Sequence, residues 1–140
     1  MSDYLLDTNH ASSLVTRDHP VRTRVDAAIE ASHRFFLTPM VVAEAIFGFS
    51  MLPRAVQNRQ EWERLRPTLL FINVEERDAI DAAFLQTSLR KRGRQLLTVD
   101  ALIASVAVRY NLTLLTSDRD FSWVPGLTTA NWVVRPAARP

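Results

Sequence analysis

The sequence of 140 residues predicts a single α/β domain in which a central parallel sheet of about five strands lies between two helix layers, an α/β/α sandwich. Short, continuously apolar runs alternate along the chain with longer stretches whose apolar residues recur at helical spacing. Continuously apolar strands are typical of a parallel sheet covered on both faces. We expect the domain to span residues 1–134 and residues 135–140 (RPAARP) to form a flexible tail.

The first half of the chain predicts two strands and three helices. Residues 3–6 (DYLL) form a short strand, and residues 19–32 have apolar side chains at helical spacing. A second strand covers residues 34–38 (RFFLT), after which Thr38 can cap a helix and Pro39 can occupy its first turn. That helix covers residues 39–52, and Pro53 begins another that ends near residue 66.

The second half predicts three more strands and two more helices. Asn73 is placed to cap a helix, with Glu76 three residues later as in a capping box, and Gly93 is placed to end that helix. Residues 98–111 (TVDALIASVAVRYN) are apolar enough to predict a helix buried on most sides. The three strands are expected at residues 68–73, 112–116 and 130–134.

Composition excludes several classes of protein. No apolar stretch approaches the roughly 18–20 residues needed to cross a membrane, and the N-terminus does not resemble a signal peptide. There are no cysteines, which excludes disulfides and thiolate metal sites, so we expect a cytoplasmic protein. With only three glycines, the chain has no phosphate-binding glycine-rich loop of the P-loop or dinucleotide-binding type.

Acidic residues follow two predicted strands and interrupt two apolar helices. Asp7 follows the first strand, and Asp118 and Asp120 follow the fourth, whereas Glu44 and Asp100 lie in the helices of residues 39–52 and 98–111. Four of them have a simpler explanation when taken alone. Asp100 would be a first-turn acid favoured by the helix dipole, Glu44 an acid at the edge of the core, and Asp118 and Asp120 turn residues. Ligands bind beyond the carboxyl ends of parallel strands, and there these acids are expected to meet.

Carboxylates gathered at one sheet edge repel one another unless a cation neutralises them. No histidine or cysteine accompanies them in these motifs, so the donor set favours Mg²⁺ or Mn²⁺. Such a centre is suited to phosphodiester hydrolysis. Sequestering the five acids leaves ten acidic residues against 17 basic ones, of which 16 are arginine and one is Lys91, and this balance favours a polyanionic substrate.

In order and spacing, YLLDTN, TPMVVAEAIFG, LLTVDALIASVAV and LLTSDRDFSWVPGL resemble the motifs of PIN-domain proteins, and most closely those of VapC-type toxins of bacterial toxin–antitoxin systems. The resemblance covers residues 3–134. It implies a PIN-like parallel α/β/α sandwich and a metal-dependent endoribonuclease that cleaves RNA and leaves a 5′-phosphate. It also implies a homodimer neutralised by a small antitoxin protein.

The resemblance assigns roles to individual residues. Asp7, Glu44, Asp100 and Asp118 match the four catalytic acids, of which Asp7, Asp100 and Asp118 are expected to ligate the metal, Asp118 directly or through water. The supporting residues are Asn9 and Thr116 as hydrogen-bonding groups and Asp120 as an outer acid or a turn residue. Leu97 departs from the family pattern, which often has proline there.

Some features have two interpretations. The cluster RKRGR at residues 90–94 is consistent with RNA phosphate binding and equally with a solvated basic helix end. Trp123 and Trp132 favour packing over base stacking, and His10 favours a surface position near a helix start over substrate contact.

Alternative functions are a PIN-class RNA-processing nuclease and a catalytically silent PIN scaffold that binds protein. Two other classes fail on their own requirements. A phosphotransfer receiver needs a lysine at the acidic site, whereas Lys91 lies in the basic cluster. A haloacid-dehalogenase-type phosphatase needs a second aspartate at the position of Asn9.

Overall fold

The computed structural model describes residues 2–133, so the predicted tail and residue 134 lie outside the described part. The predicted sandwich is confirmed: five parallel strands form one sheet in the order β3-β2-β1-β4-β5. The strands are β1 (Asp3–Leu6), β2 (Arg34–Leu37), β3 (Leu70–Phe71), β4 (Thr113–Leu115) and β5 (Thr129–Ala130). The α-helices are α1 (Thr8–Ser13), α2 (Pro20–Glu30), α3 (Pro39–Ser50), α4 (Ala55–Leu65), α5 (Glu76–Lys91) and α6 (Thr98–Arg109), and the short 3-10 helices are η1 (Arg66–Thr68) and η2 (Arg119–Trp123).

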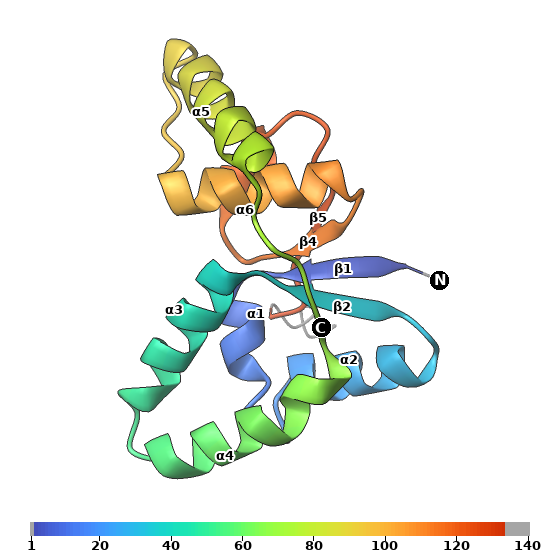
Figure 1. Ribbon diagram of the computed structural model, residues 1–140. Coiled ribbons are helices and arrows are strands. Elements are labelled where there is room, and N and C mark those ends of the chain that lie inside the picture. The colour runs from blue at the N-terminus through green and yellow to red at the C-terminus, as the bar shows by residue number, and fades with distance from the viewer. Residues whose placement is uncertain (1, 134–140) are drawn as a thin grey trace, which may run out of the picture.

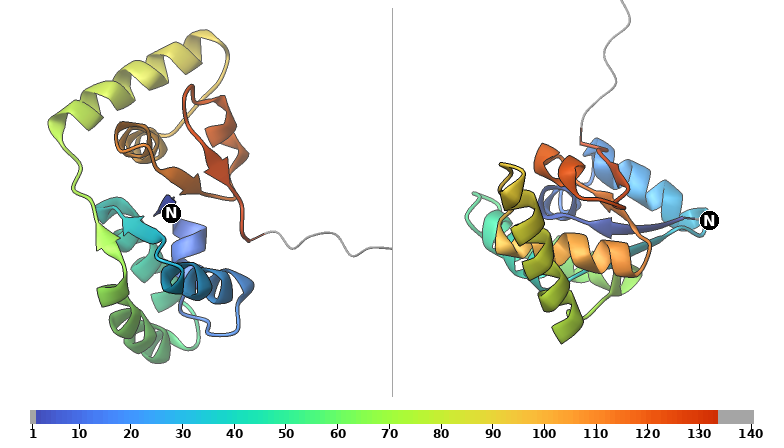
Figure 2. Two further views of the ribbon diagram at one scale, coloured as in Figure 1. Left: turned by 90° about the vertical axis from the view of Figure 1, so that its right-hand side faces the viewer. Right: turned by 90° about the horizontal axis from the view of Figure 1, so that it is seen from above.

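The helices form two layers around the sheet. In Figure 1, α5 and α6 lie above the strands, whereas α1 to α4 lie below them, and both views in Figure 2 agree with this division. The innermost strands β1, β2 and β4 are buried on both faces, with Leu5, Leu6, Leu37, Leu114 and Leu115 fully inaccessible to water. This burial explains why the strands are short apolar runs without alternation.

The order of the strands reverses its direction between β1 and β4. From β1 the chain proceeds outward through β2 to β3, and it then returns to add β4 and β5 on the other side. Leu6 is paired with Leu115, and the amide of Asp7 continues the ladder by donating to the carbonyl of Leu115 at 2.9 Å. The carboxyl ends of β1 and β4 therefore meet at the change in strand direction, where ligands of open α/β sheets bind.

Local sequence accounts for most helix starts. The Thr38 hydroxyl accepts from the Val41 amide and Pro39 occupies the first turn of α3, as predicted. Gly93 lies just beyond α5 with a φ of 74°, a left-handed conformation that glycine adopts readily, which confirms the predicted stop. The short helix α1 escaped prediction because it has only six residues and few apolar side chains, and Asp7 is its cap.

The predicted start of α5 is wrong. Glu75, not Asn73, caps the helix, and the reciprocal partner is Asp78, whose carboxylate accepts from the Glu75 amide at 2.8 Å. Asp78 is fully buried and accepts two hydrogen bonds of 2.7 Å from Arg109 of α6. This buried ion pair, which the sequence pattern does not reveal, fixes the first turn of α5.

The third and fifth strands also differ from the prediction. β3 is confined to Leu70–Phe71 because η1 occupies the residues before it. β5 ends at Ala130, so residues 131–133 of the predicted strand are not extended sheet. There the indole of Trp132 packs against Tyr4 and Phe35, which ends the pairing with β4.

No helix within residues 2–133 is long and apolar enough to cross a membrane.

Candidate functional site

Four segments bring the predicted acids to the carboxyl edge of the sheet. Asp7 directly follows β1 and caps α1, and Asp118 follows β4 and caps η2. Glu44 lies in the second turn of α3 and Asp100 in the first turn of α6. Both helices begin at this edge, because α3 follows β2 and α6 returns to the start of β4.

The carboxylate of Asp7 is held in one orientation. Its Oδ1 accepts from the Thr8 amide at 2.8 Å, and its Oδ2 accepts from the Thr116 hydroxyl at 2.7 Å. The same hydroxyl oxygen accepts from the Asp118 amide at 3.0 Å. Thr116, which is buried, thus connects the ends of β1 and β4 and positions two of the four acids.

Side chains of α1 tie the remaining site segments together. The Thr8 hydroxyl donates to Oε1 of Glu44 at 3.1 Å, and the Asn9 amide donates to the Ser117 hydroxyl at 2.9 Å. Asn9 has the supporting contact that the sequence predicts, whereas the contacts of Thr8 and Ser117 were not predicted. Their only signal was their position, since each is the neighbour of a predicted site residue.

Asp120 affects two of the four acids, Asp118 through a hydrogen bond and Asp100 through its charge. Its amide donates to Oδ1 of Asp118 at 2.9 Å, which orients the Asp118 carboxylate at the start of η2. Its own charge raises the pKa of Asp100. The position fits both sequence interpretations, an outer acid and a turn residue.

The acids perturb one another. Burial raises the pKa of Asp100 to about 6, and the negative charges of Asp7, Asp118, Glu44 and Asp120 contribute to the rise in that order. Burial also raises the pKa of Asp7, despite the opposing hydrogen bonds from Thr116 and Thr8, and the charges of Glu44 and Asp118 add to it. The residues that sequence analysis grouped therefore form one electrostatic unit.

The donor chemistry fits a hard divalent cation. Among residues 2–133, no three acidic or histidine side chains are already gathered closely enough to hold a metal ion. The carboxylates nevertheless raise the pKa of Asp100 together, and a cation would relieve that repulsion. All four candidate acids offer oxygen donors, which is the set that Mg²⁺ and Mn²⁺ prefer.

His10 does not belong to this site, and the predicted surface position is wrong. The side chain is fully buried, and its Nε2 accepts from the Trp132 amide at 2.9 Å. Burial, with a smaller effect of His19, lowers the pKa of His10 to about 4, so the imidazole is neutral at physiological pH. His10 instead joins α1 to the chain beyond β5.

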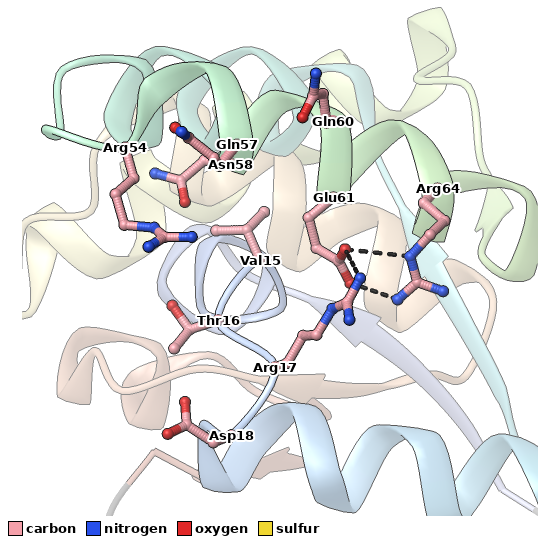
Figure 3. Close-up of a pocket in the computed structure, with 10 residues that line it drawn as sticks. All are labelled: Val15, Thr16, Arg17, Asp18, Arg54, Gln57, Asn58, Gln60, Glu61 and Arg64. Atoms are coloured by element: carbon pink, nitrogen blue, oxygen red, sulfur yellow. Dashed lines mark hydrogen bonds and ion pairs between the residues drawn. The ribbon is translucent and has the colours of Figure 1, made fainter.

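A hollow of about 710 Å³ lies elsewhere, between α4 and residues 15–18 (Figure 3). None of the predicted acids lines it. Its central group, Glu61, is largely buried and accepts hydrogen bonds from Arg17, Arg22 and Arg64, which hold its pKa well below the usual range together with their charges. Because all three arginines are paired with this carboxylate, the hollow has the character of a structural ion-pair network.

The chain resembles known proteins over most of its length. The sequence pattern of the PIN domain family matches residues 4–127. Ribonuclease VapC2 of Rickettsia felis is 28% identical over 131 residues, covering 92% of this chain and 97% of that protein.

Two solved structures have the same fold. The structure of VapBC2 from Rickettsia felis, bound to a DNA fragment from their promoter, superposes with a TM-score of 0.79 at 24% identity, covering 93% of this chain and 98% of that one. VapBC-5 from Mycobacterium tuberculosis, a member of the VapBC family of toxin–antitoxin systems, gives a TM-score of 0.63 at 22% identity, with coverages of 94% and 98%.

Proposed function

Because the chain belongs to the PIN domain family, we propose that it is a metal-dependent endoribonuclease and the toxin of a toxin–antitoxin pair, which inhibits translation or growth. The supporting observation is the acidic unit at the carboxyl edge of the sheet. There, burial and the charges of Asp7, Asp118, Glu44 and Asp120 jointly raise the pKa of Asp100. Uncompensated charge of this kind costs stability and is typical of functional sites.

Asp7, Asp100 and Asp118 are the residues that would hold Mg²⁺ or Mn²⁺ in this proposal. A bound ion of this type supplies an activated water and neutralises charge on the phosphodiester in the transition state. The chain contributes the preorganisation, since the Asp7 carboxylate and the Asp118 backbone are both fixed by the Thr116 hydroxyl. We assign the PIN-like nuclease domain to residues 1–134.

Glu44 differs from the other three acids in its surroundings. It is exposed, and one oxygen is held by the Thr8 hydroxyl, which leaves the second oxygen free. This placement suits a carboxylate that accepts a proton from the attacking water or orients that water. Glu44 is therefore proposed as a catalytic acid–base residue, with Thr8 as the residue that positions it.

Exposed apolar side chains support a protein partner. Phe47, Met51, Leu52 and Val56 lie at the end of α3 and the start of α4 and are between 55% and 73% exposed. A group of large apolar side chains of this size is typical of interaction surfaces. The proposed partners are a small antitoxin and a second copy of the chain, in keeping with the toxin–antitoxin complexes among the structural relatives.

The competing proposals are an RNA-processing nuclease of the same class and a silent scaffold. An antitoxin encoded beside the chain favours the toxin over the processing enzyme. Retention of all four acids favours either nuclease over the scaffold, because a scaffold has no need of mutually repelling carboxylates.

Cleavage of total bacterial RNA by the purified protein tests the proposal. We expect discrete fragments with Mg²⁺ or Mn²⁺, none with EDTA, and none from the Asp7→Asn variant. Asp81→Asn, which changes an exposed acid on α5, is the matched control and should cleave like the wild type. No cleavage by folded, antitoxin-free protein, together with no Mn²⁺ binding by calorimetry, would leave only the scaffold.

A further inference from the structure

We propose that Arg94, held against the indole of Trp123, binds a backbone phosphate of the RNA strand beside the acidic unit. The inference rests on the proposed nuclease function and assigns a substrate contact to it. Arg94 belongs to the basic cluster of residues 90–94, for which the sequence left two interpretations open. Three structural observations support the binding role.

The backbone of Arg94 is fixed. Gly93 adopts its left-handed conformation at the end of α5, where the Gly93 amide donates to Arg90 at 3.0 Å and the Arg94 amide donates to Leu89 at 2.9 Å. This pair of bonds is the Schellman arrangement of a helix end. The Gln86 side chain donates to the Leu96 carbonyl and the Thr98 hydroxyl, so the segment from α5 to α6 is tied down at both ends.

The side chain of Arg94 is oriented but retains its hydrogen-bonding groups. Its guanidinium carbon lies 4.5 Å from the centre of the Trp123 ring, and Trp123 is half-buried against the core. Stacking uses the face of the guanidinium and leaves its N–H edge free. Among residues 2–133, Arg94 pairs with no carboxylate, whereas Arg34, Arg64 and Arg109 each do.

The stacked pair joins two segments that hold site acids. Arg94 lies six residues before Asp100, in the segment that leads directly into α6. Trp123 is the last residue of η2. Asp118 caps the start of η2, and Asp120 lies in its first turn. The stacked cation therefore bridges the segment that leads to Asp100 and the segment that follows Asp118, whose carboxylates would otherwise repel a polyanionic strand.

This arrangement favours contact with phosphate. A guanidinium edge matches two phosphate oxygens, and a fixed side chain loses little entropy on binding. One face of Trp123 is occupied by Arg94 and the ring is partly covered by the core, so the indole is poorly placed to stack on a base. We therefore expect the contact to strengthen binding without selecting sequence.

The test measures the Kd of a fluorescein-labelled, mixed-sequence single-stranded RNA of 12 nucleotides by anisotropy. The protein carries Asp100→Asn so that binding is measured without cleavage. We expect Arg94→Gln to weaken binding about tenfold, and to lower the slope of log Kd against log salt by about 0.7. Arg94→Lys should lose less, and Trp123→Leu should weaken binding by releasing the guanidinium.

Arg24→Gln is the matched control. The Arg24 guanidinium lies 4.0 Å from the Trp132 ring, an equivalent stack, and among residues 2–133 Arg24 also pairs with no carboxylate. The Trp132 ring packs on Tyr4 and Phe35, the second residues of β1 and β2, whereas Asp7 follows the last residue of β1. We expect Arg24→Gln to leave Kd and the salt slope unchanged.

Equal Kd and salt slope for Arg94→Gln and Arg24→Gln would overturn the assignment. A second result would also overturn it: Arg94→Gln and Trp123→Leu lose RNA binding and folding stability to the same extent, and the salt slope does not change. That result would indicate a purely structural stack. Failure of the wild type to cleave RNA is a separate result: it refutes the nuclease, while the binding measurement still decides the role of Arg94.

Discussion

Replacing Asp100 by asparagine should stabilise the metal-free protein. Burial and the neighbouring acids raise the pKa of Asp100 to about 6 from an ordinary value of 3.8. A rise of about two units corresponds to roughly 3 kcal/mol against the ionised form. Because the Asp100 side chain keeps some contact with water, solvent screening reduces this energetic cost, and we expect a value between about 1.5 and 3 kcal/mol.

The sign follows from the protons bound by each state. Between the unfolded pKa of 3.8 and the folded pKa of about 6, the folded protein holds the Asp100 proton more tightly than the unfolded chain does. Stability therefore falls as pH rises through this window, and the full cost is present above it. Asparagine has no proton to lose, so the variant avoids this cost.

Urea unfolding in EDTA, followed by circular dichroism, measures the effect. At pH 7.5 the Asp100→Asn variant should have a free energy of unfolding about 1.5–3 kcal/mol above that of the wild type. At pH 4.5 the difference should shrink by about two-thirds. Asp81→Asn on α5 controls for the change in net charge and should have little effect at either pH.

A destabilised Asp100→Asn variant at pH 7.5 would refute this reasoning. A gain of equal size at both pH values would also do so, because it would then arise from packing and not from charge. Either result would remove the electrostatic support for a cation at this edge of the sheet.

Three further outcomes are expected. Thr116→Val should lower the rate of RNA cleavage about 10–100-fold without loss of folding, because the hydroxyl that orients Asp7 and Asp118 is removed. Thr116→Ser keeps the hydroxyl and should retain most activity. Equal cleavage rates for the two variants would contradict the positioning role. Glu61→Gln should lower the free energy of unfolding, measured in urea, by about 3 kcal/mol, because the buried Arg22 loses a paired carboxylate. An unchanged unfolding midpoint would show that Asp26 alone neutralises Arg22. Asp78→Asn should cost about 3 kcal/mol near pH 7, because Arg109 lowers the pKa of Asp78 against the opposing effect of burial. This contribution to stability is present above the unfolded pKa of 3.8 and is lost as pH falls through the lower folded pKa. Equal unfolding free energies of variant and wild type at pH 7 would contradict the ion pair.

The sequence contained enough local information to predict the layers of the fold. The strands containing Leu5, Phe35 and Leu114 are apolar after their first residue because both of their faces are covered, and this pattern is visible without coordinates. Thr38 with Pro39 and the isolated Gly93 are equally local signals, since a cap or a left-handed turn depends on neighbours a few residues away.

Elements decided by distant contacts were predicted poorly. The start of α5 depends on Asp78, which is fixed by Arg109, 31 residues later. The fifth strand ends where Trp132 packs on Tyr4 and donates its amide to His10. In these places the sequence offered a plausible local alternative, and tertiary burial selected another.

The candidate site divides in the same way. The sequence alone determined which acids lie at this edge, because parallel strands present their carboxyl ends there, Asp7 directly follows β1, and Asp118 lies three residues beyond β4. Only the tertiary structure decided how they are held: the Thr116 hydroxyl reaches Asp7 across 109 residues, and Thr8 reaches Glu44 across 36. Local sequence patterns predict where each strand ends and which acid follows it. A hydrogen bond between side chains distant in sequence forms only when the folded sheet has brought them together.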